Sequence, residues 1–384
     1  RKAYEEASVP KAIVSELSMF RGLALRKLLR FTEAEQVLQE MIDKKASDVF
    51  IVAGLPLTYT ADGRQVRMDM APLMPADTKE LVDAIYELSG RDEQIFTDGH
   101  NHDDDFSFAV PGMGRFRVNV FRQRGSLGAV IRVIPFTLPN PADYHIPDDV
   151  MACADFQKGL VLVTGPAGAG KSTTLASMID YINQNRADHI LTIEDPIEYV
   201  YKSKKALIHQ REVGSDVTGF AAALRSALRE DPDVILVGEM RDYETISAAV
   251  TAAETGHLVM STLHTIGAAQ TIDRIIDVCP PGAQSQIRGQ LSTVLRGVIT
   301  QQLLPLATGR GRCAATEILV GSDAVCNLIR ENKCFQIPSV LQSGAALGMH
   351  SLNGDLARLV DCGKITREAA LRCSTDKKDL EQYF

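Results

Sequence analysis

The sequence lacks a C-x-x-C cysteine pair, a long apolar run and a signal-peptide pattern. Its seven cysteines are scattered, which disfavours a zinc ribbon and fits a reducing cytosol better than a disulfide framework. No apolar run approaches the roughly 20 residues of a membrane span, so we expect no transmembrane segment. Since the chain begins with Arg1 rather than methionine, we expect the natural N-terminus to lie upstream. These absences predict a cytoplasmic protein.

An excess of positive charge is also lacking. Lysine and arginine number 41 against 49 acidic residues, which argues against a nucleic-acid partner, although a local basic groove can exist within that total. Internal repeats and low-complexity tracts are absent. What remains is 384 residues of ordinary globular composition, 45% hydrophobic and 23% charged. A chain of that length is too long for one compact core, so we expect two domains.

Residues 1–33 predict a helical extension ahead of these domains. Apolar residues recur there at three- and four-residue spacing, and the second half of the helix is basic. Such a helix can lie on an anionic membrane, but packing on its own domain or on a neighbour is the interpretation we favour. The apolar positions are Ile13, Leu17, Phe20, Ala24 and Leu28, and the basic ones are Arg21, Arg26, Lys27 and Arg30.

Residues 34–135 predict a smaller α+β domain. The stretches "SDVFIVAG" and "RFRVNVFRQRG" alternate apolar and polar residues, as half-buried strands do. Between them, "TKELVDAIYELSG" predicts a helix that ends at Gly90. The segment "PFTLPNPADYHIPDD" carries four prolines and little periodicity, so we expect the linker between the domains at 136–149.

Residues 150–384 predict an α/β domain with a predominantly parallel sheet. Four unbroken apolar runs, "LVLVTG", "ILTIED", "DVILVGE" and "LVMSTLH", are separated by helical stretches. Continuous apolar strands of this kind are typical of a parallel sheet that is covered on both faces. We expect the final part, from about 318 to 384, to be mostly helical.

The first of these runs leads into a phosphate-binding loop. "GPAGAGKS" fits the pattern G-x-x-x-x-G-K-[ST], with a strand before it and a helix after it. Backbone N–H groups of such a loop point at phosphates, and the start of the helix adds partial positive charge. We expect Lys171 to reach the β- and γ-phosphates and Ser172 to bind Mg²⁺, with Thr173 a lesser candidate. The loop residues expected to hold the nucleotide are Gly165, Pro166, Ala167, Gly168, Ala169 and Gly170.

Acidic residues follow two other apolar runs. Glu194 and Asp195 end one strand and Glu239 ends another, and the carboxyl ends of parallel strands meet at the same crevice as the loop. One acid can hold Mg²⁺ while another polarises the attacking water. We assign Glu239 to the metal, Glu194 to the water and Asp195 to a supporting role at the metal. The reverse assignment of the two glutamates stays open.

Two histidines and several arginines are further candidates. His264 follows a strand on the side of the γ-phosphate, whereas His257 lies at the opposite end of that strand and is a weaker candidate for nucleotide binding. Arg225 and Arg229 are four residues apart, so we expect them to share one helix face. Cations over the γ-phosphate favour phosphoryl transfer, and first-domain arginines can supply them across a domain or subunit boundary. Those arginines are Arg115, Arg117, Arg122, Arg124 and Arg132.

Taken together, about residues 36 to 375 resemble the secretion ATPase superfamily of type II and type IV machines, and within it the type IV pilus retraction (twitching motility) ATPases. The resemblance lies in "KKASDVFI", "DFSF", "GRFRVNVFRQRG", the phosphate loop, "TIEDPIE", "ALREDPDVILVGEMRD", "TGHLVMSTLHT" and "NLIRENK". It implies a PAS-like first domain, a RecA-like ATPase domain, ATP with Mg²⁺, and a homohexamer at the inner face of the cytoplasmic membrane. The implied partners are the inner-membrane pilus platform protein and, further, an assembly ATPase or a paralogous retraction ATPase.

The same resemblance assigns roles to particular segments. "TIEDPIE" corresponds to the aspartate box, "ILVGEMRD" to the Walker B segment and "TGHLVMSTLHT" to the histidine box. Arg117 and Arg132 match the family's first-domain arginines, and Arg225 with Arg229 matches its ATPase-domain pair. "NLIRENK", with Arg330, Glu331 and Lys333 as the residues to test, resembles the C-terminal signature of retraction ATPases.

Three alternatives remain beside a retraction motor. A pilus-assembly or type II secretion ATPase would share most motifs, but such proteins usually carry a four-cysteine zinc insertion that this sequence lacks. A RecA-like DNA motor would show DNA-stimulated hydrolysis with a steep salt dependence. A ring that only binds nucleotide is disfavoured by the acids at both strand ends.

The phosphate loop departs from the family's usual sequence. It reads GPAGAGKS where the family usually reads GPTGSGKS, a change outside the lysine and Mg²⁺ positions.

Overall fold

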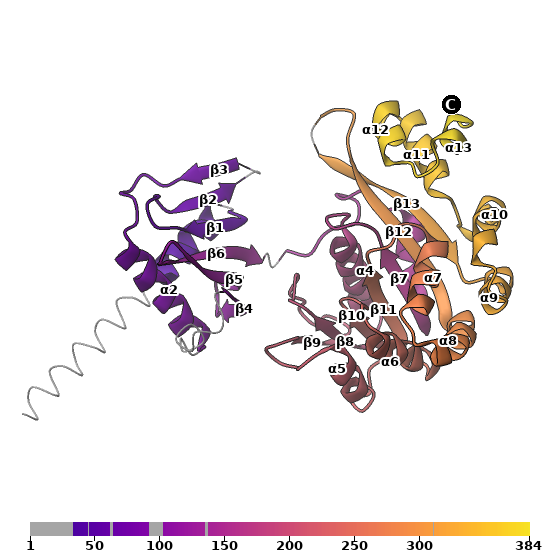
Figure 1. Cartoon of the computed structure of the whole chain (residues 1–384), viewed down its shortest axis with the longest axis horizontal. Coiled ribbons are helices and arrows are strands. Elements are labelled where there is room, and N and C mark those ends of the chain that lie inside the picture. Colours follow the sequence, from indigo (N-terminus) through magenta and orange to yellow (C-terminus); the bar gives the residue numbers. More distant parts are fainter. Residues whose placement is uncertain (1–33, 45, 62–63, 92–102, 135–136, 310) are drawn as a thin grey trace, which may run out of the picture. The chain divides into compact units, whose positions relative to one another are not determined.

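A computed structural model describes residues 34–44, 46–61, 64–91, 103–134, 137–309 and 311–384, and the chain divides into two units, Arg1–Phe136 and Thr137–Phe384 (Figure 1). The helix predicted for residues 1–33 lies outside the described residues. Among the described residues, no helix combines the length and the apolar character needed to cross a bilayer.

The first unit contains a six-stranded antiparallel sheet in the order β3-β2-β1-β6-β5-β4. Strand β5 follows the predicted alternation, since Phe116, Val118 and Val120 are buried and the residues between them are less so. Helix α2 ends at Gly90, as predicted, with the glycine in the left-handed conformation at φ 67°. Residues 34–43 are also helical. The bounds are β1 (Asp48–Ile51), β2 (Thr58–Ala61), β3 (Arg64–Arg67), α2 (Pro75–Ser89), β4 (Asp103–Val110), β5 (Gly114–Gln123) and β6 (Ser126–Ile134).

The second unit is built on a seven-stranded sheet in the order β13-β12-β7-β11-β10-β8-β9. All neighbouring strands from β12 to β9 are parallel, and β13 pairs antiparallel with β12, so the sheet is mixed. The four predicted strands are β7, β8, β10 and β11. The bounds are β7 (Gly159–Thr164), β8 (His189–Glu194), β9 (Leu207–Glu212), β10 (Val234–Val237), β11 (Leu258–Leu263), β12 (Leu295–Pro305) and β13 (Arg312–Val320).

Helices cover both faces of this sheet. The helices are α3 (Asp148–Ala152), α4 (Lys171–Asn185), α5 (Phe220–Ala227), α6 (Tyr243–Glu254), α7 (Ala268–Asp277), α8 (Pro281–Val294), α9 (Asp323–Arg330), α10 (Ile337–Ser343), α11 (Leu352–Asp361), α12 (Arg367–Cys373) and α13 (Lys377–Glu381). Three short 3-10 turns join them, η2 (Cys153–Asp155), η3 (Cys334–Gln336) and η4 (Ala345–Leu347).

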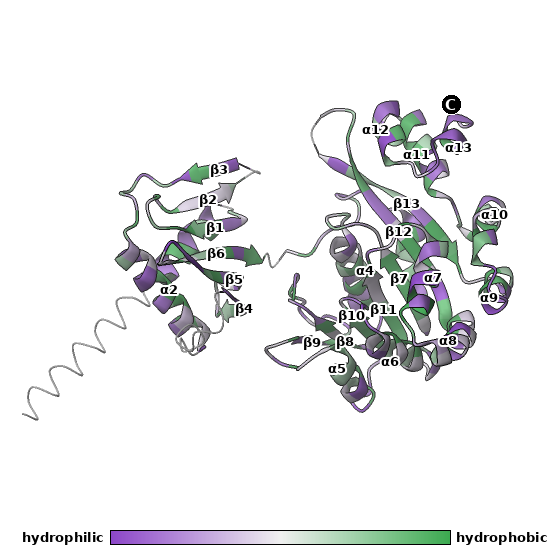
Figure 2. Cartoon of the chain, viewed as in Figure 1, coloured by the Kyte–Doolittle hydropathy of each residue, from purple (hydrophilic) through white to green (hydrophobic). Residues whose placement is uncertain are grey.

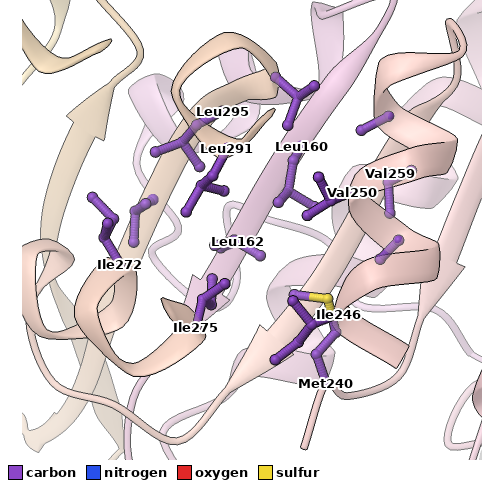
Figure 3. Close-up of a cluster of buried hydrophobic side chains, with 14 of the residues drawn as sticks. Leu160, Leu162, Met240, Ile246, Val250, Val259, Ile272, Ile275, Leu291 and Leu295 are labelled. Carbon is purple, nitrogen blue, oxygen red and sulfur yellow. The ribbon is translucent and has the colours of Figure 1, made fainter. Parts of the chain in front are cut away.

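Two cores explain the unbroken apolar strands. Leu160 and Leu162 of β7 pack on the face covered by α5 to α8, whereas Val161 and Val163 pack with α4 on the other face. Figure 3 shows the first of these cores, where Leu160 and Leu162 meet side chains of α6, α7 and α8. The hydrophobic colour follows the central strands in Figure 2. Because successive side chains of a strand alternate between faces, a strand buried on both faces has no side that faces solvent and is mostly apolar.

Two expected boundaries differ from the structure. Residues 137–149 belong to the second unit rather than to a free linker, since Ile146 is buried and Ser177 Oγ donates a hydrogen bond to the Pro139 carbonyl at 3.3 Å. The C-terminal helices begin at Asp323 rather than at about 318, because residues up to Val320 form the end of β13. Apolar content alone did not separate this edge strand from the helices that follow.

Candidate functional site

A cavity of about 280 Å³ lies where β7, β8, β10 and β11 end. It brings the phosphate loop together with residues that follow three other strands, as expected at the carboxyl edge of a parallel sheet. The lining residues include Ala167, Gly168, Lys171, Ser172, Glu194, Asp195, Glu239 and His264. These side chains come from four separate segments of the sequence, and the sheet alone makes them neighbours.

The phosphate loop connects β7 to α4 through glycines in conformations that other residues rarely adopt. Gly165, Gly168 and Gly170 have φ values of 140°, 76° and 88°. A β-carbon at Gly165 would lie 2.2 Å from the Gln301 carbonyl oxygen, so only glycine fits there. Ser172 lines the cavity, whereas the Thr173 hydroxyl lies 3.0 Å from that of Tyr199. Of the two hydroxyls that follow Lys171, the structure therefore places Ser172 at the cavity.

Lys171 is buried and is held by its own loop. Its Nζ donates to the carbonyl oxygens of Gly165 at 2.9 Å and Pro166 at 3.0 Å. Burial lowers the pKa of this ammonium group, and the nearby carboxylates of Glu198 and Glu239 oppose that effect. Phosphate oxygens can replace the two carbonyls as partners, because they offer the same contacts together with negative charge.

Glu194 has the properties of a general base. The residue is 8% exposed, and burial raises the pKa of its carboxyl group to about 7. Its Oε1 accepts hydrogen bonds from Thr192 at 2.7 Å and from Gln210 at 3.1 Å, which fix its orientation and limit the rise in pKa. A carboxylate that titrates near neutral pH can take a proton from water and return it within one reaction cycle.

Glu239 lies on the neighbouring strand end, beside two cationic or titratable groups. Its Oε1 is 2.7 Å from Arg241 Nε, and its Oε2 is 3.7 Å from His264 Nε2. The other ring nitrogen of His264 lies 3.5 Å from Lys171 Nζ. His264 thus lies between a carboxylate and the phosphate-loop lysine.

The structure does not bring every predicted residue to the cavity. His257 precedes β11 and contacts the Ala252 carbonyl at 2.9 Å, about 20 Å by strand length from the end where His264 lies. His257 therefore does not line the cavity. Arg117 and Arg132 belong to the first unit, where they face each other in the pairing of β5 with β6.

The predicted helix face shared by Arg225 and Arg229 is wrong. Helix α5 ends at Ala227, and the Arg229 N–H closes a tight turn by donating to Ser226 at 2.9 Å. The chain must leave the helix there because Asp231 takes a left-handed φ of 54° just before Pro232 and β10. Both arginines are exposed and neither lines the cavity.

Gln301 is a site residue that sequence reasoning missed. From β12 it donates to the Ala169 carbonyl at 2.7 Å and accepts from the Thr174 hydroxyl at 2.7 Å, so it joins the loop to the start of α4. Its side chain is buried among these partners. No signal marked it, because its partners lie about 130 residues earlier in the chain and a glutamine in an apolar strand carries no spacing pattern.

Replacing Gln301 by leucine is expected to weaken nucleotide binding about tenfold. The change leaves the Ala169 carbonyl and the Thr174 hydroxyl buried without this partner, at a cost of roughly 1–3 kcal/mol for each group, and part of that cost falls on the loop geometry. Titration of ADP by calorimetry measures the effect, with Gln342→Leu on the exposed face of α10 as the control. Unchanged ADP affinity in Gln301→Leu would contradict this role.

A glycine loop between a buried strand and a helix, with acids at the neighbouring strand ends, defines a P-loop nucleotide-binding protein with an α/β fold. Residues 110–359 match the sequence family "Type II/IV secretion system protein", and the chain belongs to this family.

Similar proteins place the chain further within that family. It is 50% identical over 326 residues to the type IV pilus retraction ATPase PilT of Pseudomonas aeruginosa, covering 85% of this chain and 93% of the relative. It is 54% identical over 280 residues to a twitching motility protein of Neisseria gonorrhoeae, covering 73% and 75%. A crystal structure of the pilus retraction motor PilT with bound ADP is similar with a TM-score of 0.82 and 48% identity, covering 90% of this chain and 98% of that one.

Proposed function

We propose that the chain is an ATP-hydrolysing motor that drives retraction of type IV pili. One observation carries the proposal: the phosphate loop, two acidic strand ends and His264 line a single cavity, in a chain half identical to a pilus retraction ATPase. The ADP-bound structural relative supports a nucleotide as the ligand of this cavity. Specificity for ATP is part of the proposal.

The loop binds the triphosphate and Glu194 activates water. Backbone N–H groups of Gly168 to Ser172 surround the phosphates, and Lys171 exchanges its loop carbonyls for phosphate oxygens. Glu194, with its pKa near 7, accepts the proton of the attacking water. His264, between Lys171 and Glu239, contacts the γ-phosphate and distinguishes ATP from ADP.

The cavity also fits a magnesium ion. In the described part of the chain, no cluster of three or more histidine, cysteine or acidic side chains forms a metal site on its own. Magnesium prefers one or two carboxylates or hydroxyls together with phosphate oxygens and water. Ser172 and Glu239, with Asp195 beside them, supply that donor set at the cavity. When bound there, Mg²⁺ neutralises charge on the phosphates.

Membership of this family supports a larger assembly as part of the proposal. The second unit acts as a RecA-like domain and the first as a PAS-like domain within a homohexamer. Arg117, Arg132, Arg225 and Arg229 are the arginines that act on the nucleotide in this assembly, and the last two are exposed. The hexamer works at the inner face of the cytoplasmic membrane on the pilus platform protein. Helix α9, which ends at the exposed Arg330, and the exposed Glu331 and Lys333 after it form the segment that retraction requires.

A deletion strain separates retraction from assembly. Loss of this protein is expected to increase surface pili and to stop twitching, because pilins are added but not removed. Wild-type protein restores twitching, and Glu194→Ala does not. Counts of surface pili by electron microscopy and the width of twitching zones measure both effects. Loss of pili in the deletion strain would instead support the assembly or secretion ATPase, the alternative function.

A further inference from the structure

We propose that Glu317, on β13, is a positioning residue that holds the segment carrying His264 at the nucleotide cavity. The inference rests on the proposed function and assigns a role to a side chain that does not line the cavity itself. Three residues separate His264 from Ala268, the first residue of α7. The place where α7 begins therefore limits where the His264 ring can lie.

Helix α7 has no capping side chain of its own. Its N-cap is Gly267, and the first N–H groups of a helix lack partners within the helix. Glu317 Oε1 accepts a hydrogen bond from the Ala268 N–H at 2.8 Å, from a strand 49 residues further along the chain. A carboxylate at this helix end is also favoured by the helix dipole. Glu317 thus takes the part that serine or aspartate plays in a local cap.

Thr300 anchors the same turn from the adjacent strand. It faces Glu317 in the β12–β13 pairing, and its hydroxyl accepts a hydrogen bond from the Gly267 N–H at 3.2 Å. The same hydroxyl lies 3.0 Å from that of Thr164, the residue just before the phosphate loop. The start of α7 is therefore held in a fixed relation to the end of β7.

Glu317 is itself held firmly in place. Burial raises the pKa of its carboxyl group, while hydrogen bonds from the backbone N–H groups of Ala268 and Leu352, and the nearby His350, oppose the rise. Leu352 is the first residue of α11, so one partly buried carboxylate accepts hydrogen bonds from the starts of two helices.

The decisive measurement is a comparison of kcat and KM for Mg–ATP in the purified oligomer. Glu317→Ala should lower kcat about tenfold or more and leave KM within about threefold, because the phosphate loop is supported by Gln301 rather than by Glu317. Glu317→Gln keeps an acceptor oxygen and should recover most of the activity. Glu317→Asp is one methylene shorter and should not recover the activity. If the alanine variant does not fold, this variant tests whether the length of the side chain matters. Glu368→Ala, at an exposed pair on α12, is the control.

Two further readouts exclude a merely structural role. If Glu317 acts through His264, then Glu317→Ala added to His264→Ala should cause no further loss of kcat. Amide hydrogen exchange at residues 264–271 should become faster in Glu317→Ala, and this holds whether or not the protein hydrolyses ATP. Three results would each overturn the inference. They are a double variant whose loss of kcat is the product of the two single losses, a KM that rises as much as kcat falls, and a rate of hydrogen exchange at 264–271 that stays unchanged. Wild-type protein without turnover would instead reject the proposed function.

Discussion

Lys171→Ala is expected to lose at least about 100-fold in ATP turnover and to abolish twitching, because no other cation of the phosphate loop can reach the β- and γ-phosphates. In the described structure this ammonium group contacts two loop carbonyls and lies 3.5 Å from His264, and it is the only lysine that lines the cavity. Assembled pili should persist in cells that carry this variant, since the proposed activity removes pilins.

Turnover is measured as phosphate release by the purified protein with magnesium. Lys378→Ala on the exposed surface of α13 is a matched control that removes one lysine far from the cavity in sequence and in the fold. Thermal melting of both variants checks that the fold is kept. Hydrolysis by Lys171→Ala at more than about a tenth of the wild-type rate would remove the central argument for this site.

Glu194→Gln is expected to bind nucleotide normally and to hydrolyse it at least about 100-fold more slowly. The amide keeps the shape of the side chain and can still accept the hydrogen bond from Thr192, but it cannot take a proton from water. ADP affinity and single-turnover hydrolysis separate the two effects. A different result would exchange the roles of the two glutamates: Glu239→Gln would lose more hydrolysis than Glu194→Gln and would require the same concentration of Mg²⁺ as the wild type.

The pH dependence gives an independent check on Glu194. Its pKa is raised to about 7, so the free protein has this carboxyl group mostly protonated and inactive below that pH. As pH rises through 7 the base form appears, and kcat/KM should rise and level off by about pH 8. At pH 6 the value should be about a tenth of the plateau. Glu194→Gln should remove this dependence, whereas a profile unchanged in that variant would assign the ionisation to another group.

The sequence predicted the strands whose burial leaves an unambiguous pattern. Strands β7, β8, β10 and β11 are buried on both faces and mostly apolar, so their composition alone indicates a covered parallel sheet. Strand β9, "LIHQRE", was missed because it is an edge strand with few buried residues. Strand β12 was missed because it follows α8 without an intervening turn, and no glycine or proline separates Val294 from Leu295.

The candidate site was predictable as far as its residues stand in short motifs. The loop from Gly165 to Ser172 and the acids Glu194 and Glu239 each follow a strand directly, and parallel pairing brings strand ends together. Gln301 and Glu317 stand in no motif, since each acts on a backbone group far away in the sequence. Arg229 was misplaced because its spacing from Arg225 assumes a helix that ends two residues earlier.

The antiparallel pair β12–β13 also bears on how the gene can be divided. Its residues support the nucleotide loop through Gln301 and the start of α7 through Glu317, and they lead directly into the C-terminal helices. A chimaera that exchanges everything after α8 with a relative must therefore transplant both contacts intact. Shortened versions that stop before this hairpin should fail as catalysts even though every sequence motif for nucleotide binding would still be present.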